Sequence, residues 1–117
     1  MSTDFNKSNV LKVMKTEAIT AFGDGWDEIR EYAPAEFEKM AVQIVSIAKN
    51  VALYKSSNKQ KGYSAQTGKV LMKMQRTAME SVFVAVSALV LLTIQRAINA
   101  IFKVLRQAFE SALKSIL

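Results

Sequence analysis

The feature that most constrains this chain is an uncharged run from Val82 to Ile94, which contains only apolar residues apart from Ser87 and Thr93. If the run is helical, it has no polar face, and a helix that is apolar on every side must be enclosed on every side. One neighbouring helix cannot enclose it. The enclosure is therefore the centre of the chain's own fold, the matching helices of other copies, or lipid.

Length argues against lipid as the first choice. The uncharged segment 81–95 lies between Glu80 and Arg96, and as a helix it is about 22 Å long, against roughly 30 Å for the hydrocarbon core of a bilayer. Extending it to residues 81–102 makes it long enough but brings Arg96 inside, at a cost of about 2.5–3.5 kcal/mol at the bilayer centre. Burial against helices is therefore preferred, and insertion of residues 82–102 into a membrane is the alternative.

The rest of the chain shows helical periodicity, and its four glycines and single proline fall between or at the edges of the periodic runs. Apolar residues recur at helical spacing on one side of segments 8–22 and 34–55. Gly23 is suited to end the first helix, and Asp24 and Ser64 are suited to cap the helices that follow them. The predicted helices are 8–22, a short helix 24–33, 34–55 and a long segment 64–117.

The last segment has no proline, and no glycine after Gly68, so no local signal ends a helix before the C-terminus. A continuous helix over 64–117 would be roughly 75–80 Å long, which exceeds the width of a compact domain of this mass. The segment must therefore bend back or project. We predict a single all-α domain over residues 1–117, a helical hairpin with a long C-terminal helix, in an oligomeric helical bundle or coiled coil.

Half of the residues are apolar, and a small soluble monomer seldom leaves a large apolar patch exposed. This surplus predicts a homo-oligomer in which the apolar helix is shared between copies. The predicted oligomer interface is formed by Val82, Phe83, Val86, Leu89, Val90, Ile94, Ile98, Ile101 and Leu105.

Charge is divided between the two parts of the chain. Residues 1–38 hold 8 acidic and 4 basic side chains, whereas residues 39–117 hold 2 acidic and 12 basic ones. The acidic side chains gather at Asp24, Asp27, Glu28, Glu31, Glu36 and Glu38. The residues predicted to contact an anionic partner are Lys55, Lys59, Lys61, Lys69, Lys73 and Arg76. Such a partner is the acidic part of another copy or acidic lipid headgroups; nucleic acid is disfavoured, because no nucleic-acid-binding motif accompanies the lysines.

Composition excludes most chemistry. The chain has no histidine and no cysteine, so it lacks imidazole bases, thiol nucleophiles and the usual zinc ligands. Asp24, Asp27 or Glu28, and Glu31 share a helix face, but nothing predicts the apolar cleft that a general acid requires. We predict no catalytic residue, no metal site and no cofactor, and hence a protein that is not an enzyme.

Four segments carry a resemblance: "WDEIREYA", "EFEKMAVQIVSIAKNVALYK", "VLMKMQRTAMESVFVAV" and "QRAINAIFKVLRQAFESAL". Together they resemble a group of small, largely uncharacterised helical proteins encoded by phages and prophages, over about residues 26–113. This chain departs from that group in having lysines and no acids in the loop before Gly62. The resemblance implies a virion or assembly context, with other structural proteins of a particle as partners. We therefore predict a self-associating structural or adaptor subunit, cytoplasmic or virion-associated, with a holin-like or pore-forming membrane protein as the alternative.

Overall fold

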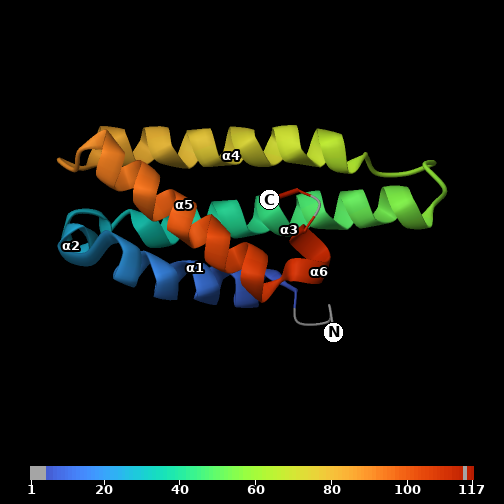
Figure 1. Ribbon diagram of the computed structural model, residues 1–117. Helices are drawn as coiled ribbons and strands as arrows, with labels where there is room; N and C mark the ends of the chain where they lie inside the picture. The colour runs from blue at the N-terminus through green and yellow to red at the C-terminus, as the bar shows by residue number, and fades with distance from the viewer. Residues whose placement is uncertain (1–4, 115) are drawn as a thin grey trace.

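The computed structural model describes residues 5–114 and 116–117, and within them every regular element is helical (Figure 1). This confirms the all-α class. In chain order the elements are α1 (Lys7–Phe22), the 3-10 turn η2 (Gly23–Gly25), α2 (Trp26–Ile29), α3 (Ala33–Ser56), α4 (Ala65–Val86), α5 (Leu91–Ala108) and α6 (Glu110–Leu113).

The long helices form an elongated bundle of 47 × 25 × 19 Å. Helices α1, α3 and α4 lie side by side with alternating direction, and α5 crosses them obliquely while contacting α1 and α4 (Figure 1). The α4–α5 turn and α2 lie at one end of the bundle, and the α3–α4 loop lies at the other. The fold thus has two distinct ends.

The periodic segments fold as their patterns predict. In α3 the apolar positions from Phe37 to Val51 that share one side are buried, and in α1 Val10, Met14 and Ala18 are fully buried. Gly23 ends α1 with a positive φ of 56° and donates its N–H to the carbonyl of Ile19, as predicted.

Only one of the two predicted N-caps is present. The Ser64 hydroxyl accepts a hydrogen bond from the N–H of Thr67 at 3.2 Å, which confirms it as the N-cap of α4. The prediction for Asp24 is wrong, since α2 has Gly25 at its N-cap position and no side-chain capping bond. The chain continues from α1 through a 3-10 turn in which Gly25 is itself near-helical, so no extended residue offers a capping side chain.

The segment 64–117 is not one long helix. Helix α4 ends at Val86, residues 87–90 are extended or irregular, and α5 returns along the bundle. The Ser87 hydroxyl donates to the carbonyl of Phe83 at 2.7 Å, which also accepts the Ser87 N–H. The same hydroxyl accepts the N–H of Leu89 at 3.3 Å, a donor that a continuing helix would have bonded to a backbone carbonyl. The break lets both halves bury apolar residues in one core.

The uncharged run is therefore enclosed differently from the prediction. Phe83 is fully buried and makes edge-to-face contacts with Phe22 and Phe37, at centroid distances of 5.8 and 5.9 Å. Ile94 is also fully buried, whereas Val84 and Val90 are exposed. The expectation that this run is hidden on every side is wrong within the chain, because its middle is a turn and not a helix in the centre of a bundle.

Candidate interaction surface

Helix α4 has two apolar faces. One face contacts α3 and α5 and buries Gly68, Met72, Met79 and Phe83. The opposite face points to solvent and consists of Val70, Met74, Thr77, Ser81 and Val84, spaced alternately four and three residues apart. We call these five residues the outer stripe. It carries no charged residue, although solvent-facing helix surfaces are usually charged or polar.

The outer stripe is exposed because α4 lies at the edge of the bundle. Helix α4 buries 4 of its 22 residues, whereas α3 buries 9 of 24. Val70 and Met74 are 57% and 60% exposed, and Val84 is 45% exposed. Nothing in the described chain covers this side of α4.

The apolar surface continues into the α4–α5 turn. We call residues 87–92 the tip; within it Val90, Leu91 and Leu92 are each about half exposed or more. Of the ten large hydrophobic residues that are exposed in the described chain, six lie between residues 70 and 92. Such a concentration on α4, the turn after it and the first two residues of α5 is the usual mark of a contact surface.

Charged side chains lie on one edge of the outer stripe. Lys69, Lys73 and Glu80 lie on the same edge of α4 at helical spacing, and the two lysines are exposed. Glu80 is half-buried and its carboxylate accepts a hydrogen bond from the Gln95 amide at 3.3 Å. The stripe is thus bordered by both signs of charge.

The residues predicted to form an oligomer interface are divided between the core and the tip. Phe83, Ile94, Ile98, Ile101 and Leu105 are buried in the chain's own core and are not presented to a partner. Val82, Val86 and Leu89 are partly buried against that core, and only Val90 of the nine is exposed. The prediction that the first five form an interface is wrong, because the return of α5 along α1 and α4 already covers them.

The basic residues do not form one patch either. Lys55, Lys59 and Lys61 surround the α3–α4 loop at one end of the bundle, and Lys69 and Lys73 lie along α4. Arg76 is half-buried: it donates a hydrogen bond to Asn99, and its guanidinium group lies 5.1 Å from the centroid of the Phe102 ring. Its assignment as a contact for an anionic partner stays a prediction.

The opposite end of the bundle is acidic. Asp24, Asp27, Glu28 and Glu31 are all exposed there, on and around η2 and α2. This acidic end adjoins the tip, because the Leu89 side chain packs on Gly25 so closely that a β-carbon at this glycine would lie 3.0 Å from it. The bundle thus has a basic end at the α3–α4 loop and an acidic end beside the tip.

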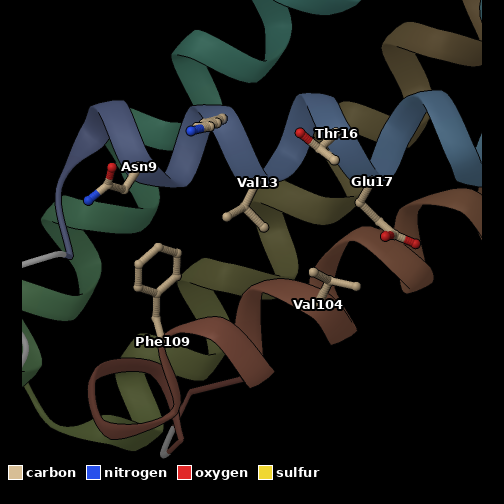
Figure 2. A pocket seen from close by; sticks show the side chains of 7 residues that line it. Asn9, Val13, Thr16, Glu17, Val104 and Phe109 are labelled. Atoms are coloured by element: carbon tan, nitrogen blue, oxygen red, sulfur yellow. The ribbon is translucent and has the colours of Figure 1, made fainter.

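The described residues include acidic side chains and one open groove, which bear on metal binding and ligand binding. No group of three acidic side chains among them is placed to hold a metal ion. An open groove of about 620 Å³ lies between α1 and the end of α5, where Val13 faces Val104 and Phe109, with Thr16 and Glu17 on its rim (Figure 2).

None of the helices in the described part of the chain is both long and apolar enough to cross a membrane. Comparison with protein-family models, with curated proteins and with solved structures gives no match to this chain. The surface of α4 is consequently interpreted from its own chemistry. The apolar pattern at Val70, Met74 and Val84 is visible in the sequence, but only the packing of Met72 and Met79 shows which face of α4 is inside.

Proposed function

We propose that this protein is a non-enzymatic structural or adaptor subunit that associates with copies of itself through the outer stripe and the tip. The observation that carries the proposal is the gathering of six of the ten exposed large hydrophobic residues between residues 70 and 92. The particle context comes from the resemblance of residues 26–113 to helical phage and prophage proteins.

The energetics indicate how much of this surface must be used. Full burial of a large apolar side chain contributes about 1.5–3 kcal/mol, and each of the six has roughly half of its surface left to bury. Each copy thus supplies roughly 5–9 kcal/mol and a pair roughly 9–18 kcal/mol, whereas association costs about 4–15 kcal/mol in lost freedom of motion. The contact therefore needs most of the surface, and one charged substitution within it is enough to dissociate the copies.

Sedimentation velocity without detergent tests the proposal. The wild-type chain is expected to sediment as a discrete multimer, and Met74→Lys is expected to sediment as a monomer, because Met74 is 60% exposed and its replacement does not disturb the core. The matched control is Ile19→Lys on α1, where the side chain is 52% exposed outside the proposed surface. A monomeric wild-type chain, or equal dissociation by both variants, would contradict the proposal.

A membrane-active role is the alternative, and the exposed Val90, Leu91 and Leu92 at the tip are the observation in its favour. The acidic end beside the tip opposes it, since anionic headgroups repel carboxylates. Flotation with vesicles of anionic lipid distinguishes the two. If the chain floats with the vesicles and Leu91→Lys abolishes flotation, the membrane role is favoured over self-association.

A further inference from the structure

We infer that the partner of the outer stripe is the outer stripe of a second copy, lying antiparallel to it across a two-fold axis near Thr77. This inference rests on the proposed self-association and specifies its geometry. It follows from three observations: the order of side chains along the stripe, the charges at its edge, and the charges at the two ends of the bundle.

The order of side chains favours the antiparallel direction. The alternating four- and three-residue spacing of the stripe is the spacing of residues at the seam between two packed helices. Residues equally distant from Thr77 meet when the second helix is reversed, so Val70 faces Val84 and the large Met74 faces the region of the small Ser81. In a parallel pair Met74 would meet Met74 and Ser81 would meet Ser81, which crowds one layer and leaves a void in the other.

The edge charges favour the same direction. At 1.5 Å per residue, Lys73 lies about 6 Å from Thr77 along the helix axis and Glu80 lies about 4.5 Å from it on the other side. When the second helix is reversed, Lys73 of each copy and Glu80 of the other differ in height along the helix axis by only about 1.5 Å, so the two side chains are able to pair. In a parallel pair the same edge of the two helices lies on opposite sides of the seam, so Lys73 and Glu80 of the two copies do not meet.

The ends of the bundle add a third reason. Side by side and antiparallel, the basic end of each copy, with Lys55, Lys59 and Lys61, lies at the same level along the pair as the acidic end of the other. A parallel pair aligns ends of like charge. The antiparallel arrangement is also closed, since each copy uses the same surface and the pair leaves no second stripe free.

Cysteine cross-linking tests the geometry, and the chain contains no native cysteine to interfere. Three single variants place a thiol on the stripe: Thr77→Cys at the centre, and Val70→Cys and Val84→Cys on either side. A disulfide requires Cα atoms within about 7 Å, whereas two copies of residue 70 would lie about 21 Å apart along the axis of an antiparallel pair. Ile19→Cys, on the exposed side of α1, measures the background from random collisions.

Under mild oxidation we expect Thr77→Cys to form a covalent dimer by itself. Val70→Cys and Val84→Cys are expected to stay monomeric when alone and to cross-link to each other when mixed. Adding Met74→Lys to Thr77→Cys should reduce cross-linking to the Ile19→Cys background.

The other outcomes separate the failure of this inference from the failure of the proposed function. If Val70→Cys and Val84→Cys each cross-link to themselves, the pair is parallel and the inference is overturned while self-association stands. If the chain sediments as a multimer but no stripe cysteine exceeds the background, the copies meet elsewhere and the inference is overturned. If the wild-type chain is a monomer by sedimentation, the proposed function itself fails.

Discussion

Phe83 and Val84 are neighbours in the sequence with opposite environments. Truncating each of them tests whether the uncharged run has one buried side and one exposed side. Phe83 is fully buried between Phe22 and Phe37, whereas Val84 is 45% exposed on the outer stripe. If both belonged to a helix enclosed on every side, both truncations would be costly. In the observed fold we expect only Phe83→Ala to be costly.

The expected magnitudes follow from the contacts. Removing a buried phenylalanine side chain costs about 3–5 kcal/mol, and the two edge-to-face ring contacts of Phe83 place the expected loss in the upper half of that range. Val84→Ala removes methyl groups that are already half in water and gains a few tenths of a kcal/mol in helix propensity. Its net effect on the free energy of unfolding is expected to stay within about 0.5 kcal/mol.

The assay is urea unfolding followed by circular dichroism and by the fluorescence of Trp26, the single tryptophan of the chain. Both truncations are made in the Met74→Lys background, so that loss of self-association does not contribute to the measured stability. With a urea dependence of about 2 kcal/mol per molar, Phe83→Ala should lower the unfolding midpoint by about 2 M and Val84→Ala should leave it nearly unchanged. Should Phe83→Ala not fold, Phe83→Leu gives a smaller shift in the same direction. Similar shifts at the two positions would refute the reasoning.

Two further predictions concern the packing of α4 and its loop. Gly68→Ala should lower the free energy of unfolding by about 1–2 kcal/mol after the gain in helix propensity is subtracted. The reason is that the new β-carbon would lie 2.7 Å from a methyl group of Val51 and 2.8 Å from one of Ile116. Thermal unfolding measures the change in stability, and a stabilised variant would show that the contact is not tight. Burial raises the pKa of Tyr63 above its ordinary value of 10.0, against a smaller lowering by the hydrogen bond with Asn50, so the folded state holds the phenolic proton more tightly than the unfolded state. The contribution of Tyr63 to stability is thus complete below pH 10 and is lost as the pH rises through the folded-state pKa. In Tyr63→Phe the free energy of unfolding should therefore depend less on pH above pH 10. An unchanged pH dependence would contradict this.

The sequence predicts α1 and α3 well because each has one apolar stripe and clear end signals. In α3 the stripe from Phe37 to Val51 has a single polar side opposite it, so only one orientation buries the apolar residues. Gly23 and Ser64 act locally, through a positive φ and a side-chain hydrogen bond, and both are visible from residue type alone. Local chemistry is sufficient for these elements.

The break at Ser87 is not visible in the same way. No glycine or proline marks it, and serine occurs in many helix interiors. The helix ends there because the return of α5 places Ile94, Ile98 and Ile101 against the same core that Phe83 enters, and this gain depends on residues far apart in the sequence. The periodicity of a segment reports how one helix is patterned, and it does not report where that helix must stop to meet its neighbours.

Periodicity does not identify the outer stripe as an exposed surface either, because α4 carries an apolar set on each of two opposite faces. Met72 and Met79 form one set with Phe83, and Val70 and Met74 form the other with Val84. From the sequence, either set is able to face the core, and a helix apolar on both sides is expected in the centre of a bundle. The fold gives α4 an edge position instead, so one apolar face packs in the core and the other remains exposed. The exposed apolar residues of the described chain therefore lie mostly on a helix face and its adjoining turn. If copies associate there as proposed, one charge reverses the association without unfolding the chain, because these residues are outside the core.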